Sequence, residues 1–373
     1  MGHPPRRISD GEQVGMNVAI IGCGYWGPNL VRNFVSLDGC DRVFCCDTDS
    51  ERLVRIRNLH PQVTTTTELS DILEDPSIDA VVVATPVVTH FDVARRALQA
   101  GKHVLVEKPL AASTQECEAL VEIADAGSSI LMVAHTFEYS VALNKAKEII
   151  DRGDLGIIHY VSIQRLNLGP YRPDVNVLWD LAAHDVSILL YLLEGQPTGV
   201  NAQAQAFLRT GHADVATAMV HFDNGAVAFL HDSWLDPHKV RRVTVVGSRK
   251  MLVYDDVSMN EKIKIFDKGI DAPAEHDTYA DFHFSYRYGD IQSPRIEEKE
   301  PLRVQCEHFL QCIKDGSVPR SDGRSGTRVV ELLEAMTESI RQKGGFVALP
   351  QVSASAEEPI ELEAQPRLAA SGH

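Results

Sequence analysis

Lys108 has a residue type and a setting that suit acid–base chemistry. It stands in Glu107-Lys108-Pro109, directly after the apolar run 103–106. A charged pair at the end of a buried strand is costly unless it faces a cleft. In a cleft, Lys108 could polarise a hydroxyl or carbonyl group, or pass a proton, if its neighbours lower its pKa. The residues alone also allow a Glu–Lys pair on the surface.

The apolar segment 179–194 carries a second set of polar side chains. Four of them recur at helical spacing and would form one stripe on a buried helix: Asp180, His184, Ser187 and Tyr191. His184 has an ordinary pKa that suits taking a proton from an alcohol near neutrality. Asp180 could orient His184 or bind substrate, whereas Asp185 lies off the stripe and is expected to be a structural partner. A helical histidine can equally be a satisfied core residue.

A glycine-rich turn near the start could hold the phosphates of a dinucleotide. The apolar run 18–21 leads into Gly22-Cys23-Gly24-Tyr25-Trp26-Gly27, and an amphipathic segment begins at Pro28. In the pattern G-x-G-x-x-G, one glycine permits the turn, the second admits a pyrophosphate and the third lets helix pack on strand. Free N–H groups at the start of the helix would bind the phosphates. A structural turn is the alternative.

Asp47 ends the next predicted strand, 42–46, about 20 residues after the last glycine. A carboxylate there would accept a hydrogen bond from the adenosine ribose 2′-OH and disfavour a 2′-phosphate. The sequence therefore predicts NAD as cofactor, with NADP less favoured. Arg52 argues against that preference, although we expect it to lie on the following helix.

The elements that would position these groups alternate up to about residue 137. Strands over 79–84, 103–106 and 130–134 alternate with helices over 89–100 and 114–126. This pattern predicts an α/β fold with a doubly wound parallel sheet, which binds its ligand at the carboxyl ends of the strands. Further cofactor contacts are expected from the segments after those strands: Ala84, Thr85, Pro86, His90, Glu107 and Lys108.

From about residue 156 the pattern changes. Strands are predicted over 157–167, 200–209, 215–222, 226–234, 240–246 and 251–255, with a hairpin turn at Asp223-Asn224-Gly225. Such strands favour a mainly antiparallel sheet with one covered face. Residues 268–300 are interpreted as a long polar excursion that contacts another subunit. Helices are predicted over 302–314 and 327–342.

These elements divide the chain into two domains between two tails. We predict a disordered leader over 1–15, a dinucleotide-binding domain over 16–137, a substrate and oligomerisation domain over 138–350, and a disordered tail over 351–373. The two C-terminal helices could pack back onto the first domain. A homodimer or homotetramer is expected to form through the C-terminal sheet.

Composition excludes several other classes of protein. The 373 residues carry a net charge of −16, which argues against nucleic acid and anionic membranes as partners. No apolar run approaches the length of a membrane span, and the polar start lacks the apolar core of a signal peptide. Seven cysteines without a ligand-like pair indicate reduced thiols and a cytoplasmic location. No metal site is predicted, and a zinc alcohol dehydrogenase is disfavoured because no Cys/His set has suitable spacing.

The glycine turn, Glu107-Lys108-Pro109 and the Asp180–His184 helix occur in an order and spacing that resemble the glucose–fructose oxidoreductase/inositol dehydrogenase (Gfo/Idh/MocA) family over about 16–350. The resemblance implies an N-terminal Rossmann domain and a C-terminal α+β domain with an open-faced sheet. It also implies NAD(P)-dependent oxidation of a sugar or cyclitol hydroxyl, or reduction of the matching ketone. Lys108 takes the place of the family's motif lysine, and Asp180 and His184 take those of its active-site acid and histidine.

A set of basic, polar and aromatic residues on the approach to this helix is expected to bind the substrate: His135, Arg165, Asn167, Arg172, Trp179, Asp180, Trp234, Lys239 and Arg241. The basic run 237–242 suits a diphosphate, although charges at a strand start explain it equally well. With the segment 176–180, it resembles the family branch that acts on nucleotide-linked sugars. We therefore expect oxidation or reduction at a ring carbon such as C3 of a nucleoside-diphosphate sugar. Free inositol or hexose is one alternative substrate, and a non-catalytic NAD-sensing protein is another reading.

Overall fold

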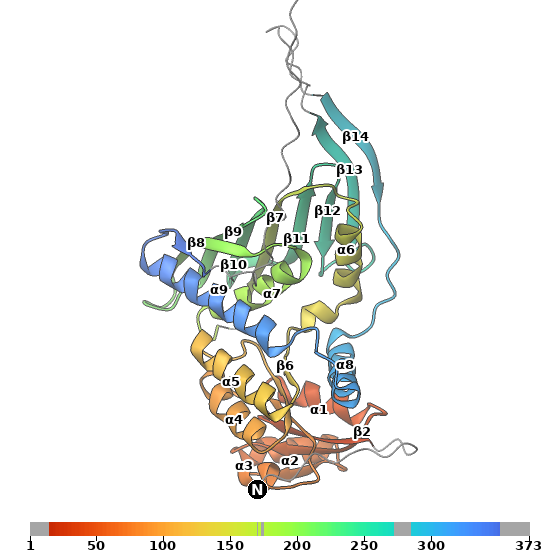
Figure 1. Cartoon of the computed structure of the whole chain (residues 1–373), viewed down its shortest axis with the longest axis vertical. Helices are drawn as coiled ribbons and strands as arrows, with labels where there is room; N and C mark the ends of the chain where they lie inside the picture. The colour runs from red at the N-terminus through yellow and green to blue at the C-terminus, as the bar shows by residue number, and fades with distance from the viewer. Residues whose placement is uncertain (1–14, 170, 173–174, 272–284, 351–373) are drawn as a thin grey trace, which may run out of the picture.

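The first sheet of the computed structural model is parallel, and its strand order is β3-β2-β1-β4-β5-β6 (Figure 1). Its strands are β1 (Met16–Ile21), β2 (Cys40–Cys46), β3 (Thr64–Thr66), β4 (Ala80–Val83), β5 (His103–Val106) and β6 (Leu131–Val133). Every residue of β4 is buried, as expected of a strand that helices cover on both faces. The structure describes residues 15–169, 171–172, 175–271 and 285–350.

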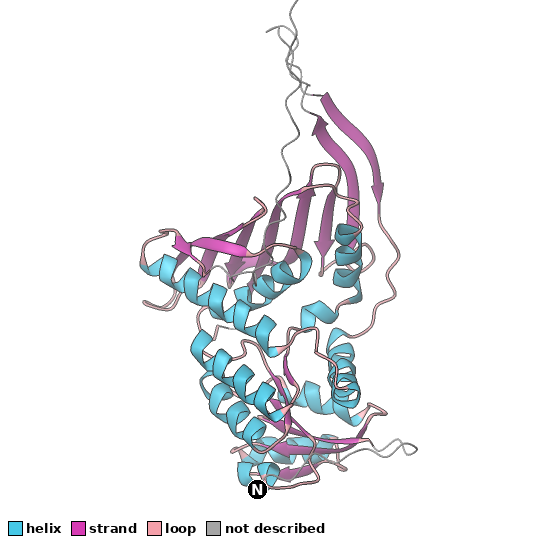
Figure 2. Ribbon diagram, in the orientation of Figure 1, coloured by secondary structure: helices cyan, strands magenta, loops and turns pink. Residues whose placement is uncertain are grey.

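Helices cover both faces of this sheet, which confirms the doubly wound α/β fold (Figure 2). They are α1 (Gly27–Val35), α2 (Ser50–Leu59), α3 (Leu69–Leu73), α4 (Val87–Gln99) and α5 (Thr114–Gly127). Phe34 and Ile56 from α1 and α2 pack on one face, and Ile72 and Leu120 from α3 and α5 pack on the other. The carboxyl ends of β1, β4 and β5 are left to face the second half of the chain.

The second sheet has nine strands in the order β14-β13-β12-β11-β7-β10-β9-β8-β15. They are β7 (Ile158–Leu168), β8 (Pro197–Gln205), β9 (Val215–Phe222), β10 (Val227–Ser233), β11 (Leu235–Gly247), β12 (Met251–Asp255), β13 (Ile263–Asp271), β14 (Ser285–Gln292) and β15 (Val347–Ala348). Neighbouring strands are antiparallel except for β7 and β10, which pair in parallel. The mainly antiparallel sheet is therefore confirmed.

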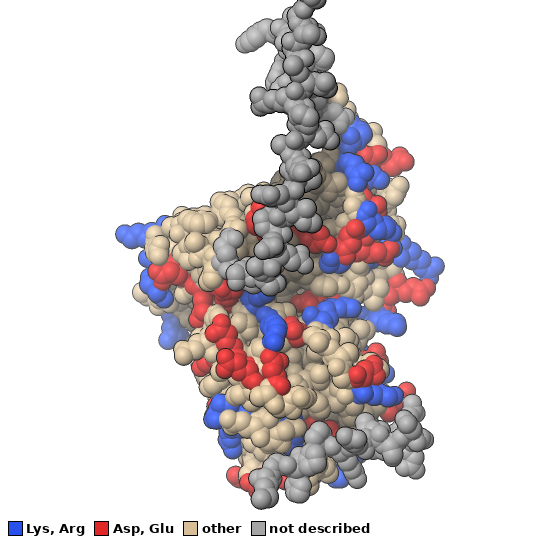
Figure 3. Space-filling model, in the orientation of Figure 1, with Lys and Arg blue, Asp and Glu red and all other residues tan. Residues whose placement is uncertain are grey.

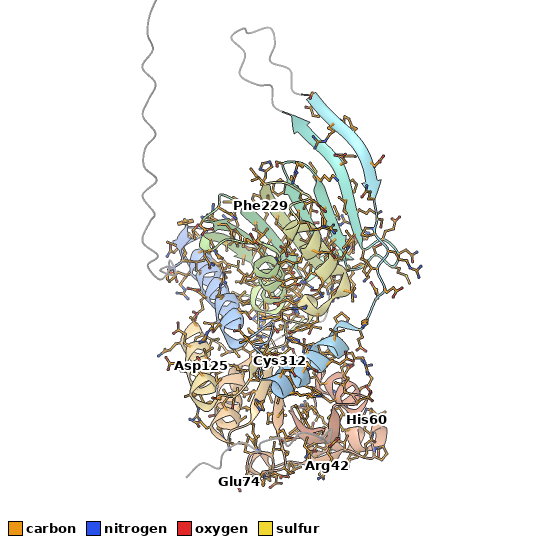
Figure 4. All side chains as sticks on the ribbon, turned by 45° about the vertical axis from the view of Figure 1, so that its right-hand side comes forward. Arg42, His60, Glu74, Asp125, Phe229 and Cys312 are labelled. Carbon is orange, nitrogen blue, oxygen red and sulfur yellow. The ribbon has the colours of Figure 1, made fainter. Side chains whose placement is uncertain are left out.

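One face of this sheet is covered and the other is open. The covering helices are α6 (Val141–Asp151), α7 (Ala183–Leu192) and α9 (Gly323–Arg341), whose apolar side chains share one core with the strands. Phe229 of β10 lies on the uncovered face with 45% of its surface exposed (Figure 4). An open-faced sheet is thus present, as the family resemblance implies.

Helix α8 (Pro301–Asp315) leaves the second sheet and packs against the first. Its Phe309 and Leu310 join the core formed by β1, β2 and α1, and Figure 4 labels Cys312 near its end. The longer helix α9 contacts α5 and β6 as well as α7 and β8. These two helices therefore tie the parallel sheet to the open-faced one.

The interpretation of 268–300 as a polar excursion is wrong for 268–271 and 285–292, which lie in strands, and the contact with another subunit remains a prediction. Strands β13 and β14 pair antiparallel and extend the sheet at its edge. Most residues of β14 are exposed. Its sequence therefore lacks the alternation of apolar and polar residues that predicts a half-buried strand. Residues 272–284, almost all of the predicted leader and the predicted tail lie outside the described residues. None of the described helices is long and apolar enough to cross a membrane.

Candidate active site

The glycine turn after β1 can be built only with glycine at two positions. Gly22 has a φ of +98°, and a Cβ there would lie 2.6 Å from the carbonyl oxygen of Ala84. A Cβ at Gly27 would lie 2.3 Å from the oxygen of Gly22. Helix α1 starts at Gly27, and no side chain caps its first N–H groups. The turn therefore fits a dinucleotide, whose phosphates those N–H groups would bind.

Asp47 braces this turn from the end of β2. Its Oδ2 accepts a hydrogen bond from the Cys23 amide at 2.6 Å, and its Oδ1 accepts one from the Asp49 amide at 2.8 Å. Arg52 lies on α2, as expected, and its guanidinium is 3.4 Å from Asp47 and 3.3 Å from Asp49. The carboxylate and the guanidinium thus stand together beside the turn. Tyr25 and Trp26 are exposed on its other side.

His90 ties together the loops that follow β4 and β5. Its ring is buried, with Nε2 2.8 Å from the Thr85 oxygen and Nδ1 2.9 Å from the Pro109 oxygen. Burial lowers the pKa of this ring, which is the main effect on it. His90 was expected to bind the cofactor, but its ring contacts the two loops that carry Thr85, Pro86 and Lys108.

Lys108 is buried and paired across the junction between the two halves. Its Nζ donates to the Asp180 carbonyl oxygen at 2.8 Å and lies 3.3 Å from the Asp180 carboxylate. The two side chains are only 9% and 13% exposed, so this is not a Glu–Lys surface pair. Burial lowers the pKa of Lys108, and Asp180 and Glu107 oppose that shift. Burial also raises the pKa of neighbouring Glu107 to about 7.

Asp180 is shared by three side chains, Lys108 from the parallel-sheet half and two from the substrate-side half. Besides Lys108, its oxygens contact Arg172 at 3.4 Å and accept from the Trp234 indole at 3.3 Å. The hydrogen bonds found for the described residues include none between Asp180 and His184. The structure therefore places Asp180 on Lys108 rather than on the histidine.

His184 presents a buried imidazole whose Nδ1 lacks a partner. Its Nδ1 is buried without a hydrogen-bond partner among the described residues, and the ring meets Phe137 edge-on at 5.1 Å. Burial lowers the pKa of His184 well below its ordinary value, and the nearby Lys108 and Arg165 lower it further. A neutral imidazole can accept a proton.

His135, at the end of β6, is a second buried imidazole near Lys108. Neither of its ring nitrogens has a hydrogen-bond partner in the described part of the chain. Burial, with a smaller contribution from Lys108, lowers the pKa of His135 to about 3. Because unpartnered buried polar atoms are costly, a bound ligand would be a suitable partner for this ring.

Asp180 lies in a π-helical turn, η2 (Leu178–Ala182), which directly precedes α7. The sequence predicts one continuous helix and one polar stripe, but a π-turn widens the helix and shifts the faces of the residues after it. Further along, the Tyr191 hydroxyl donates to Asn144, and the Ser187 hydroxyl is buried. Only Asp180 and His184 of the predicted stripe approach Lys108.

Two of the predicted substrate residues point into the protein. Arg165 is buried and bonds Asp185 at 2.7 Å, and its guanidinium lies 4.4 Å above the ring of Phe137. The indole of Trp179 donates to Thr337 on α9 at 3.1 Å and packs against both cores. Neither side chain is placed to bind a sugar directly, because the polar group of each already bonds a partner inside the protein.

The predicted basic run splits between the two faces of the second sheet. Arg241 lies opposite Arg165 in the register of β11 with β7, 5.7 Å from the Phe137 ring and 3.3 Å from Asp256. Arg242 bonds Asp255 at 2.8 Å instead, as strand alternation requires. Lys239 is exposed and Asn167 is half-buried. Arg241 is therefore the member of this run that approaches His184, and Arg172 reaches Asp180.

Two further residues contact this region, Phe137 and Asp232, and sequence reasoning missed Asp232. Phe137 lies in η1 (Thr136–Tyr139) and meets both His184 and Arg165. Asp232 is buried on β10, two residues before Trp234. A carboxylate in the apolar strand 226–234 was the available signal. The part of the chain that the structure describes holds no cluster of His, Cys, Asp and Glu suited to a metal ion.

The surface charge matches the acidic composition. On the face in Figure 3, acidic side chains gather over α5 and α9. Burial raises the pKa of Glu331 in this area, and Glu118 and Glu334 raise it further. An anionic substrate would therefore depend on local cations near Lys108.

Both halves of the chain match models of one family. Residues 16–135 match an oxidoreductase family with an NAD-binding Rossmann fold, and residues 143–253 match the GFO/IDH/MocA C-terminal domain. The chain belongs to the GFO/IDH/MocA family. It is therefore an NAD-binding oxidoreductase that acts on CH–OH groups.

Curated relatives extend over most of this enzyme. A UDP-N-acetylglucosamine 3-dehydrogenase of Acidithiobacillus ferrooxidans is 27% identical over 84% of this chain and 94% of its own. Its solved structure has a TM-score of 0.74 and covers 88% of this chain and 99% of that one. An NAD-dependent scyllo-inositol 2-dehydrogenase of Bacillus subtilis is 26% identical over 87% of this chain and 93% of its own. Levoglucosan dehydrogenase, solved with NADH and levoglucosan, shares the fold at 21% identity, with a TM-score of 0.76 over 91% of this chain and 100% of that one.

Proposed function

We propose that this enzyme transfers a hydride between NAD(H) and a ring carbon, C3, of a nucleoside-diphosphate sugar. The observation that carries the proposal is the buried Lys108–Asp180 contact, with the buried imidazole of His184 one helical turn after Asp180. Lys108 follows β5, on the edge of the parallel sheet where the glycine turn lies, so both would border one bound dinucleotide.

Each side chain has a separate task in this mechanism. When bound, NAD⁺ supplies the acceptor for the hydride that leaves the sugar carbon. His184 accepts the proton of the same carbon's hydroxyl, so the two losses together leave a ketone. The ammonium of Lys108 donates a hydrogen bond to that oxygen and stabilises the negative charge that develops on it.

Asp180 positions Lys108 rather than His184 in this scheme. It holds the ammonium through both its carbonyl oxygen and its carboxylate, and Trp234 fixes the carboxylate in turn. A lysine with its pKa lowered by burial exchanges protons more readily than an exposed one. In the direction of ketone reduction, Lys108 and a protonated His184 would be the donors.

Two arginines support the nucleotide-linked substrate. Arg172 is 42% exposed beside Asp180, and Arg241 is 39% exposed above Phe137. Guanidinium groups suit diphosphates because they form paired hydrogen bonds to phosphate oxygens. Similarity to a UDP-N-acetylglucosamine 3-dehydrogenase agrees with this choice and with C3 as the reacting carbon.

Free inositol is the second candidate. Its specific support is that Asp256 already pairs with Arg241, which reduces the charge available to a diphosphate. Several relatives are inositol dehydrogenases, including one of Thermotoga maritima that is 22% identical over 88% of this chain. A cyclitol would need only hydroxyl-binding groups such as Lys108, His184 and His135.

Initial rates of NADH formation at 340 nm decide between the candidates. We expect kcat/KM for a UDP- or dTDP-linked sugar to exceed that for myo-inositol or a free hexose by about 100-fold. Arg172→Gln and Arg241→Gln should raise KM for the nucleotide sugar about tenfold and raise KM for a free sugar much less. Arg242→Gln, on the opposite face of the sheet, is the matched control. A higher kcat/KM for inositol, or no effect of either arginine, would reject the nucleotide-sugar assignment.

A further inference from the structure

Three charged side chains are buried together behind His184. They come from different elements: Arg165 from β7, Asp185 from α7 and Asp232 from β10. Their exposed fractions are 5%, 0% and 1%. The proposed mechanism uses none of them, so their presence in the core needs another explanation.

The cluster holds two carboxyl groups and one guanidinium. Both Nε and Nη2 of Arg165 contact Asp185 Oδ1, at 2.7 and 2.5 Å, and Asp232 lies opposite Arg165 in the pairing of β10 with β7. Asp185 Oδ2 and Asp232 Oδ1 find no N–H or hydroxyl partner among the described residues. Two carboxylates beside one guanidinium in a dry site leave an uncompensated negative charge, which one proton shared by the carboxyl groups removes.

The charged groups around Asp232 favour it as the protonated member. Burial raises the pKa of Asp232 well above its ordinary value, and Asp185 and Asp180 raise it further, whereas Arg165 lowers it. Arg165 in turn faces Asp185, Asp232 and Asp256, and the attraction of these carboxylates raises its pKa. With one shared proton, the cluster has no net charge.

The cluster touches both halves of the proposed catalytic centre. The Arg165 guanidinium lies 4.4 Å above the ring of Phe137, and that ring also meets His184 at 5.1 Å. Asp232 pairs with Arg165 in the register of β10 and β7. Two residues further along, Trp234 donates to Asp180.

We propose that Arg165, Asp185 and Asp232 form a positioning cluster, kept neutral by one shared proton, that holds Phe137 against His184 and Trp234 against Asp180. The inference rests on the proposed function, because it assigns the cluster to that reaction. Arg165 also places a fixed positive charge near His184, which keeps the imidazole neutral and able to accept a proton.

The shared proton is tested by the pH dependence of the melting temperature. A carboxyl whose pKa is raised in the folded state stabilises the fold fully below its unfolded pKa of about 3.9 and loses that contribution as pH rises. Asp232→Asn keeps a hydrogen-bond donor and removes the titration. Its melting temperature relative to wild type should therefore rise between pH 5 and 8. A difference that stays constant or falls with pH overturns the shared proton.

The positioning role is tested by kinetics with the substrate that the wild type turns over. Arg165→Met should lower kcat at least about tenfold and leave KM for NAD⁺ unchanged. It should also move the acidic limb of the kcat/KM profile to higher pH, because the pKa of His184 rises when a neighbouring cation is removed. Arg165→Lys keeps the charge, so its limb should stay in place even if kcat falls. A loss of kcat in Arg165→Met without that movement indicates packing alone and overturns the role.

The two proposals fail in different ways. If the wild type oxidises no sugar, the proposed function fails, and the catalytic half of this inference fails with it. The melting-temperature comparison still decides the shared proton in that case. If the wild type is active and both Arg165 variants match it, the proposed function stands and the positioning role is rejected. If Arg165→Met does not fold, the Arg165→Lys variant and Phe137→Leu, which should also lower kcat, decide the role.

Discussion

Lys108 depends on burial as much as on position. An ammonium that is 9% exposed is costly in water-free surroundings, and the Asp180 carboxylate offsets that cost only in part. Its pKa is therefore lowered, and a substrate oxygen would give the ammonium an additional hydrogen-bond partner. A solvent-exposed lysine in the same segment would keep its ordinary pKa, because burial would not lower it.

At the residue scale, part of the candidate active site was predictable from the sequence. The positions of Lys108 and His184 follow from a strand end and a buried helix, because both are local patterns. The roles of Arg165 and Asp180 do not follow from such patterns. Arg165 meets Asp232 through the pairing of β7 with β10 and Asp185 through the packing of α7. Asp180 contacts Lys108 from a π-turn that no local sequence pattern predicts.

Asp47 offers a residue-scale prediction about the cofactor. Asp47→Asn removes the charge that holds Arg52 and would repel a 2′-phosphate. We expect kcat/KM for NAD⁺ to fall about tenfold and the NADP⁺/NAD⁺ ratio to rise, because Arg52 becomes free to bind phosphate. Initial rates with both cofactors measure this.

The control for that prediction is Arg52 itself. The double variant Asp47→Asn/Arg52→Gln should lose the gain with NADP⁺ and keep the loss with NAD⁺. An unchanged cofactor ratio in the single variant would contradict the role given to Asp47.

At the element scale, alternation was easier to predict than irregularity. The runs 103–106, 215–222 and 251–255 coincide with β5, β9 and β12, since each is apolar or alternating and ends at a clear turn. Strands β13 and β14 were missed because their exposed faces carry polar residues. Helix α6 was also missed, and it covers the second sheet with Leu143 and Ile149.

The turn between β1 and α1 yields an element-scale prediction. Gly22→Ala should raise the Kd for NAD⁺ at least tenfold, because its Cβ meets the backbone of Ala84 and displaces the turn. Gly101→Ala is the matched control, since its φ is also positive, at +76°, but its Cβ meets nothing within 4 Å.

Titration of NAD⁺ by calorimetry separates the two variants. Both should lose some stability from the positive φ, about 1–2 kcal/mol. Only Gly22→Ala should lose affinity. Equal NAD⁺ affinities for the two variants would contradict the account of the turn.

At the scale of the whole molecule, the two sheets supply different residues of the candidate active site. The parallel sheet supplies the glycine turn and Lys108, and the open-faced sheet with α7 supplies Asp180 and His184. Helices α8 and α9 join the parallel sheet to the open-faced sheet. The candidate active site lies where these two parts of the molecule meet (Figure 1). The predicted oligomer through the C-terminal sheet remains a prediction.

The open face of that sheet is where this prediction is tested. A depression there is lined by polar and apolar side chains that include Met219, Phe229 and His231. Phe229→Asp should lower the mass measured by light scattering to that of a smaller assembly, because a buried carboxylate opposes association. Val318→Asp, at an exposed apolar position before α9, is the control. An unchanged mass for Phe229→Asp would place the interface elsewhere.

The central claim is that Lys108 acts on the substrate and not on the cofactor, and Lys108→Met tests it most directly. Turnover and NAD⁺ affinity are measured on the same preparation, with Lys145→Met on the exposed part of α6 as the control. We predict that kcat falls at least about 100-fold while the Kd for NAD⁺ stays within about threefold of wild type. A Lys108→Met enzyme with near-wild-type kcat would contradict the account.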